Sequence, residues 1–152
     1  MRILLDTNVL LRLDDEAHAQ HNVSIAAVER LDGAGYECVL VPQVLYEYWV
    51  VATRPANVNG LGLDAVHADL VVSEWTRFFH VLLDERGVFG RWRALVSNHR
   101  VQGKPAHDAR LVAAMQRHGV QHLLTFNKPD FARFPSITVF SPADVLAGAV
   151  PA

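Results

Sequence analysis

The chain has little cysteine, little net charge and no long hydrophobic run. Cys38 is the only cysteine among 152 residues, so no internal disulfide can form, and this is typical of a reducing compartment. No apolar stretch approaches the roughly 18 residues that a membrane-spanning helix needs. The apolar run after Arg2 is also too short for a secretion signal. We therefore expect a soluble, cytoplasmic protein that does not use a membrane.

The charged residues are nearly balanced overall but unevenly distributed. The formal net charge is −2, so no strong overall field attracts nucleic acid. Basic residues nevertheless gather in the segment 91–110, where Asp108 is the only acid. This segment is either a solvated helix surface or a strip that contacts the phosphates of RNA. The candidate RNA contacts within it are Arg93, Lys104, His107 and Arg110.

Apolar patterning predicts strands that alternate with helices. We expect one domain over residues 1–152, with an α/β fold in which three α/β/α layers surround a mainly parallel sheet of about five strands. The predicted strands are short apolar runs near residues 4–6, 38–41, 80–83, 121–126 and 137–140. The predicted helices span about 9–13, 22–31, 42–53, 63–79, 92–101 and 106–118, with a final helical turn after 142.

Two acidic residues follow predicted buried strands. Asp6 ends the apolar run 3–5, and Asp130 lies beyond the run 121–126 in a tight Asn-Lys-Pro-Asp turn. Ligand sites in parallel α/β sheets lie outside the carboxyl ends of the strands, so both acids are expected at that edge. Asp130 taken alone is equally well explained as a turn residue.

Two further acids lie on predicted helices. Glu47 falls within the apolar segment 44–51, which predicts a helix buried nearly all round. A glutamate there must be hydrogen-bonded, metal-bound or paired, and an ion pair with Arg54 is the structural alternative. Asp108 precedes Leu111 by three residues in a first helical turn, so it points inward from the helix end that favours negative charge. Its alternative role is a helix-capping acid.

Carboxylates gathered at one sheet edge repel one another, and their pKa values rise unless positive charge compensates them. Hard divalent cations such as Mg²⁺ or Mn²⁺ supply that charge and prefer oxygen ligands, whereas zinc and copper favour nitrogen and sulfur. Metal ions about 3.5–4 Å apart can activate water and stabilise the leaving oxygen of a phosphodiester. An all-carboxylate site therefore favours metal-dependent phosphodiester chemistry.

The ordered motifs resemble the PIN domain nucleases. That family begins with a strand that ends in Asp-Thr/Ser-Asn/Ser, as residues 6–8 do here, and carries a helical glutamate about forty residues later, as Glu47 does. A third acid opens a helix near the C-terminus, like Asp108, and a Thr-x-Asn/Asp-x-x-Asp-Phe turn follows, here 125–131. The resemblance covers residues 3–140, and in length the chain is most similar to VapC-type toxins of bacterial toxin–antitoxin pairs.

This resemblance implies an endoribonuclease that uses Mg²⁺ or Mn²⁺ and a metal-activated water to cleave RNA phosphodiester bonds. It implies a cognate antitoxin protein as partner, and we also expect a homodimer. Many relatives carry an acid where this chain has Asn127, which leaves open whether a second metal binds firmly. By position, the implied catalytic and metal-binding residues are Asp6, Glu47, Asp108 and Asp130, the last directly or through water, and the orienting residues are Thr7, Asn8 and Asn127.

Other functions make different demands on the sequence. An RNA-processing PIN nuclease has the same site without a toxin role, and a non-catalytic binding module predicts no metal-dependent loss of RNA. An aspartate-nucleophile phosphatase needs a second acid two residues after the first, where this chain has Asn8. A phospho-receiver domain needs an acceptor acid after a central strand, and the segment 38–42 has none.

Histidines and aromatic residues are interpreted mainly as structural. His118 and His122 are four residues apart, but Gly119 interrupts the helix that a zinc pair needs, and no cysteine cluster supports zinc. Large aromatics at helical spacing favour core positions, with an exposed groove for an antitoxin peptide as the alternative. These aromatics are Tyr46, Trp49, Trp75, Phe78, Phe79 and Trp92.

Overall fold

Five short strands form one sheet in the order β3-β2-β1-β4-β5, and every neighbouring pair is parallel. The computed structural model describes residues 1–150, so the expected domain end at residue 152 lies outside the described residues. All five predicted strands are present, with shorter bounds. They are β1 (Arg2–Leu5), β2 (Glu37–Leu40), β3 (His80–Val81), β4 (His122–Leu124) and β5 (Thr138–Phe140).

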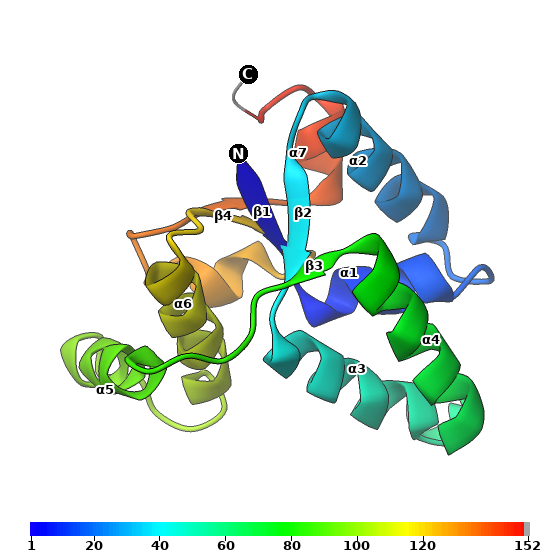
Figure 1. Cartoon of the computed structure of the whole chain (residues 1–152), viewed down its shortest axis with the longest axis horizontal. Coiled ribbons are helices and arrows are strands. Elements are labelled where there is room, and N and C mark those ends of the chain that lie inside the picture. Colours follow the sequence, from blue (N-terminus) through cyan, green and yellow to red (C-terminus); the bar gives the residue numbers. More distant parts are fainter. Residues whose placement is uncertain (151–152) are drawn as a thin grey trace.

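Helices cover both faces of this sheet. Figure 1 shows α5 and α6 on one side and α1 to α4 with α7 on the other, which confirms the predicted three-layer α/β/α fold. The α-helices are α1 (Thr7–Asp14), α2 (His21–Gly33), α3 (Pro42–Thr53), α4 (Ala65–Phe78), α5 (Val88–Asn98), α6 (Ala106–His118) and α7 (Pro142–Leu146). Two 3₁₀ turns, η1 (Ala56–Val58) and η2 (Lys128–Phe131), lie in the connections.

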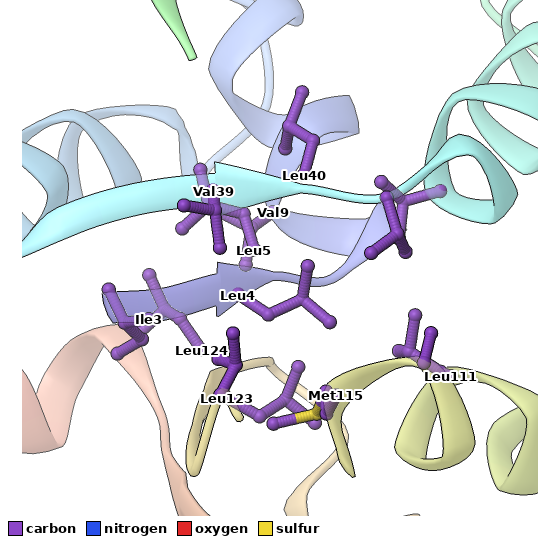
Figure 2. Close-up of a cluster of buried hydrophobic side chains, with 14 of the residues drawn as sticks. Ile3, Leu4, Leu5, Val9, Val39, Leu40, Leu111, Met115, Leu123 and Leu124 are labelled. Atoms are coloured by element: carbon purple, nitrogen blue, oxygen red, sulfur yellow. The ribbon is translucent and has the colours of Figure 1, made fainter. Parts of the chain in front are cut away.

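The core is built from strand side chains that contact helices on both faces. Leu4, Leu5 and Leu123 are fully buried, as strands of a parallel sheet between two helical layers require. Figure 2 shows Met115 of α6 on one side of these strands and Val9 of α1 on the other. Burial on both faces explains why the strands read as unbroken apolar runs rather than as alternating patterns.

The strand order reverses direction between β1 and β4. The chain moves from β1 to β2 and β3 on one side, then crosses to β4 and β5 on the other. The Asp6 N–H donates to the Leu124 carbonyl at 3.0 Å, which extends the β1–β4 pairing by one step. The carboxyl ends of β1 and β4 therefore lie side by side at a topological switch point, where α/β sheets place their ligands.

Helices α1 and α5 differ from their predicted bounds. Helix α1 begins at Thr7, two residues earlier than predicted, and Asp6 is its N-cap, because the Asp6 carboxylate accepts the N–H of Thr7. Helix α5 begins four residues earlier than predicted, since Gly87 takes a left-handed conformation (φ +94°) that turns the chain into the helix. It also ends before the predicted residue 101, because Arg100 adopts a positive φ of 49°.

The prediction that α3 is buried nearly all round is wrong, as is the core prediction for two aromatics. Tyr46 and Val50 on α3 are 61% and 57% exposed, and Phe78 on α4 is 77% exposed. Helix α3 therefore buries one side against the core and presents the other to solvent. Cys38 is partly buried, and desolvation raises the pKa of its thiol to about 12. Within residues 1–150 no helix is long and apolar enough to cross a membrane.

Candidate active site

Asp6 lies at the carboxyl end of β1 and is only 9% exposed. The Thr7 N–H donates to its Oδ1 at 2.8 Å, while Thr125 Oγ1 and Asn8 Nδ2 donate to its Oδ2 at 2.7 and 3.1 Å. Burial raises the pKa of Asp6, the charge of Glu47 adds to this, and the three hydrogen bonds oppose it. The result is a buried carboxylate held in one orientation.

Thr125 and Asn8 connect the ends of β1 and β4. Thr125 is fully buried, and its hydroxyl accepts from Asn8 Nδ2 and from the Asn127 N–H, both at 3.0 Å, while it donates to Asp6. The Asn8 Oδ1 in turn accepts the Phe126 N–H at 3.1 Å. One donor and two acceptors use the full hydrogen-bonding capacity of the Thr125 hydroxyl.

Glu47 lies on the second turn of α3, and both of its carboxylate oxygens have a partner. Thr7 Oγ1 donates to Oε2 at 2.7 Å, and Gln43 Nε2 donates to Oε1 at 3.0 Å. The ion pairs of residues 1–150 do not include Glu47 with Arg54, so that alternative is wrong. Glu47 is instead linked to Asp6 through the single residue Thr7.

Asp108 lies in the first turn of α6, and within residues 1–150 its carboxylate makes no hydrogen bond or ion pair. Burial raises its pKa to about 6, and the charges of Asp130, Asp6 and Glu47 each add to the rise, while His107 opposes it. A capping acid has a lowered pKa and a bonded helix N–H, so the capping alternative does not describe Asp108. Asp6, Glu47 and Asp130 therefore lie close enough to Asp108 for their charges to act on it.

All four acids line one cleft with a volume of about 450 Å³. An adjoining hollow of about 580 Å³ shares three of the acids and adds Pro105 and His107. Asp130, the third residue of η2, is exposed, so the cleft is open to solvent on that side. The polar side chains that line the cleft are Asp6, Thr7, Asn8, Glu47, Arg54, Lys104, Asp108, Asn127 and Asp130.

The donor set of this cleft fits a hard divalent cation. Carboxylate oxygens are the ligands that Mg²⁺ and Mn²⁺ prefer. Burial and, after it, the charges of the three neighbouring acids raise the pKa of Asp108, and a bound cation would offset both effects. In the described part of the chain, no three His, Cys, Asp or Glu side chains already form a metal-binding group. The cleft is open to solvent at the exposed Asp130, so water and substrate oxygens would be needed to complete a coordination shell there.

The candidate RNA-binding residues separate into two groups. Lys104 and His107 line the two hollows beside the acids. Arg93 is exposed on α5 and lines neither hollow. Arg110 is directed elsewhere, because its guanidinium donates to Gln43 Oε1 at 2.9 Å and to Asp84 at 3.4 Å.

Two residues of this site, Gln43 and Thr125, were not assigned roles from the sequence. Both are buried, and both hold an acid by hydrogen bonds. A signal existed for each of them: Thr125 directly follows a buried strand, and Gln43 precedes Glu47 by four residues on the same helix face. Neither signal identifies the partner, because that depends on how distant elements meet.

Three histidines make local contacts with the backbone. His18 Nδ1 accepts the Gln20 N–H, and His21 Nδ1 lies 2.8 Å from the Arg12 carbonyl. His118 Nε2 lies 2.9 Å from the Leu83 carbonyl.

The fold and the site define a class: a parallel α/β domain with an acidic cleft at its topological switch point. Residues 3–136 match the family model described as the PIN domain. Because that match spans most of the chain, this protein belongs to the PIN domain family, as the ordered motifs predicted. No curated protein sequence matches the chain at a significant level.

Solved structures with the same fold include chains from toxin–antitoxin systems. Rickettsia felis VapBC2, bound to a promoter DNA fragment, has a chain with a TM-score of 0.70 and 13% identity, covering 93% of this chain and 98% of that one. A toxin–antitoxin complex from Klebsiella pneumoniae gives 0.64 and 21%, with 92% and 97% covered. Mycobacterium tuberculosis VapC20, described as a sarcin–ricin loop cleaving toxin, gives 0.58 and 19%, with 80% and 86% covered.

Proposed function

We propose that this protein is a Mg²⁺- or Mn²⁺-dependent endoribonuclease. The observation that carries the proposal is the cleft itself, in which four carboxylates from different elements line one space. Burial, together with the charges of the other three acids, raises the pKa of Asp108 to about 6. Membership of the PIN domain family supports the same function. So does the fold shared with VapC20, which is described as a sarcin–ricin loop cleaving toxin.

The chain's own residues would hold the cation and orient the substrate. Asp6, Glu47 and Asp108 would bind it, and Asp130 would add an oxygen directly or through water. A bound divalent cation supplies the charge that activates water and stabilises the leaving oxygen of a phosphodiester. Thr7 fixes one oxygen of Glu47 and one of Asp6, so the ligands are oriented before a cation arrives.

The residues around the acids suit a polyanionic substrate. Lys104 and Arg54 line the cleft, and His107 lines the adjoining hollow. We propose that Lys104 and His107 contact RNA phosphates there, with Arg93 reached by a longer stretch of RNA. Arg110 would contribute less, because one of its nitrogens already donates to Gln43.

We further propose that this enzyme is the toxin of a toxin–antitoxin pair and acts in the cytoplasm as a homodimer. The shared fold with two toxin–antitoxin complexes supports this role. An apolar groove of about 780 Å³ between α3, α4 and β3 offers a surface for a protein partner, with Tyr46 and Leu83 on its rim 61% and 67% exposed. Rescue of growth by the product of an adjacent gene distinguishes this role from RNA processing without an antitoxin.

The decisive experiment is cleavage of total RNA with and without Mn²⁺ by wild type and by Asp6→Asn. We expect cleavage only by wild type and only with the cation, because Asp6 is the most buried of the four acids and lines the same cleft as the other three. Glu47→Gln and Asp108→Asn should be equally inactive while remaining folded by circular dichroism. Metal-independent cleavage, or full activity in Asp6→Asn, would contradict the proposal and favour a binding module or a contaminating nuclease.

A further inference from the structure

We propose that Gln43 is a positioning residue that ties Glu47 to the start of α6 and thereby sets the placement of Glu47 relative to Asp108. This inference rests on the proposed metal-dependent function. Gln43 occupies the first turn of α3 and is only 7% exposed. It lies outside the lining of the acidic cleft, so its role would be exerted through Glu47 and α6 rather than on substrate.

The Gln43 amide makes three hydrogen bonds to two different parts of the chain. Its Nε2 donates to Glu47 Oε1 at 3.0 Å and to the His107 carbonyl at 2.8 Å. Its Oε1 accepts from Arg110 Nη1 at 2.9 Å. His107 immediately precedes Asp108, so the bond to its carbonyl holds the peptide group from which Asp108 extends.

These partners determine which way round the amide lies. A carboxylate and a backbone carbonyl can only accept, and a guanidinium can only donate. The nitrogen of the amide must therefore face Glu47 and His107, and its oxygen must face Arg110. A glutamine satisfies all three groups at once, whereas a glutamate in its place would put a third acceptor against the other two.

Other contacts between the two helices are sparse. Helices α3 and α6 make few backbone contacts with each other, although they carry Glu47 and Asp108 to the same cleft. The remaining oxygen of Glu47 is held by Thr7, which belongs to α1 and does not reach α6. Arg110 is itself joined to Asp84 in the loop after β3, which steadies the oxygen side of the Gln43 amide.

The inference is tested by titrating Mn²⁺ into wild type, Gln43→Met and Gln43→Glu by calorimetry, with no RNA present. Outer groups that orient metal ligands typically change metal affinity by about 10–100-fold. We expect Gln43→Met to weaken Mn²⁺ binding by at least about tenfold on that basis. Gln43→Glu should weaken it too, because the added carboxylate repels Glu47 and the His107 carbonyl.

Gln116→Met is the matched control. That amide donates to Ser136 Oγ at 3.0 Å on the surface, away from the cleft. Its loss should leave Mn²⁺ affinity unchanged. Melting curves without metal show whether each variant is folded, and if Gln43→Met has no cooperative transition, Arg110→Met replaces it. Arg110→Met removes only the donor to the amide oxygen and should weaken Mn²⁺ binding less than the loss of the amide itself.

Each outcome decides the matter. Wild-type affinity in folded Gln43→Met, or in Arg110→Met where it stands in, overturns the positioning role and leaves the proposed function intact. Tighter binding by Gln43→Glu also overturns it, because charge alone then governs affinity. Failure of the wild type itself to bind Mn²⁺ overturns the metal-dependent function, and this inference with it.

Discussion

Asp108 is the residue in which the electrostatics of the cleft are most visible. It is half-buried, it makes no hydrogen bond within residues 1–150, and three other acids add to the rise in its pKa to about 6. An ionised carboxylate in such a place lowers the stability of the fold. That cost is understandable if the cleft is built for a cation, because binding sites commonly retain charge that destabilises the empty protein.

Asp108→Asn should therefore stabilise the protein in metal-free buffer while abolishing RNA cleavage. The folded pKa of about 6 lies above the ordinary 3.8, so between these values the folded state binds more protons than the unfolded state. The contribution of the Asp108 carboxyl to the unfolding free energy accordingly falls as the pH rises from about 3.8 through about 6. Because the carboxyl is half exposed, we expect a gain of only about 1 kcal/mol at pH 7.

Urea unfolding at several pH values measures this effect. The difference in unfolding free energy between Asp108→Asn and wild type should shrink as the pH falls from 7 and vanish near pH 4. A variant less stable than wild type at every pH would mean that the Asp108 carboxylate supports the fold.

Thr125 is the residue on which the orientation of Asp6 depends most. Thr125→Val keeps the shape of the side chain but removes the donor to Asp6 and the acceptor for two N–H groups, from Asn8 and Asn127. Buried groups left without partners typically cost about 1–3 kcal/mol, so we expect a loss of about 2 kcal/mol in unfolding free energy. RNA cleavage should fall as well. Thr138→Val on the exposed edge of β5 is the control, and equal losses in both variants would exclude a specific role for the buried hydroxyl.

Three helices that begin at the same edge of the sheet bring the site together. Helix α1 starts after β1 with Asp6 as its cap, α3 starts at Pro42 after β2, and α6 starts at Ala106. Each therefore presents its N-terminal turns, where negative charge is favoured, to the region beyond the strands. The loop after α3 also contributes to the site, because Arg54 at its start lines the cleft.

Gly60 in that loop should tolerate no side chain. An added Cβ would lie 1.8 Å from the Arg54 carbonyl oxygen, so the backbone would have to move. We expect Gly60→Ala to lower the unfolding free energy by about 3 kcal/mol or more. Gly33→Ala is the control: nothing lies within 4 Å of its added Cβ, and alanine favours a helix over glycine by up to about 1 kcal/mol. Thermal melts in which both variants behave alike would contradict the steric argument.

The molecule as a whole carries little net charge, and its cleft is acidic. With a formal net charge of −2, long-range attraction to RNA is weak, so binding depends on where the basic side chains lie. Lys104 lines the cleft. Helix α6, which follows Lys104 in the chain, covers one face of the sheet (Figure 1). A cation that neutralised the acids would at the same time reduce their repulsion of RNA phosphates.

Lys104→Ala should weaken RNA binding and flatten its dependence on salt. Removal of one phosphate contact reduces the slope of log K against log salt by about 0.7–0.9. Arg93→Ala should have the same kind of effect only if RNA extends along α5. Arg30→Ala is the control, because α2 ends at the opposite edge of the sheet, before β2 begins. Binding isotherms of inactive Asp6→Asn at several salt concentrations measure the slopes, and an unchanged slope in Lys104→Ala would remove that residue from the RNA path.

Local patterns were sufficient for much of this protein. The apolar period and the flanking Pro42 and Gly119 predicted helices 42–53 and 106–118 with the bounds that are observed. The alternation of strands and helices predicted the parallel three-layer fold. The acids that follow strands or open helices were predicted to lie together at the carboxyl edge of the sheet. These features were readable because each depends on neighbours within a few residues along the chain.

Contacts between distant segments were decided only by the tertiary structure. Thr125 bonds Asp6 across 119 positions, and Arg110 bonds Gln43 across 67, with no local pattern to pair them. The apolar pattern of α3 also could not predict that Tyr46 is exposed, because the helix is apolar both on the side that it buries and on the side that faces solvent. The sequence determined which residues can do chemistry, and the strand order β3-β2-β1-β4-β5 determined which of them meet, because it alone brings the ends of β1 and β4 together.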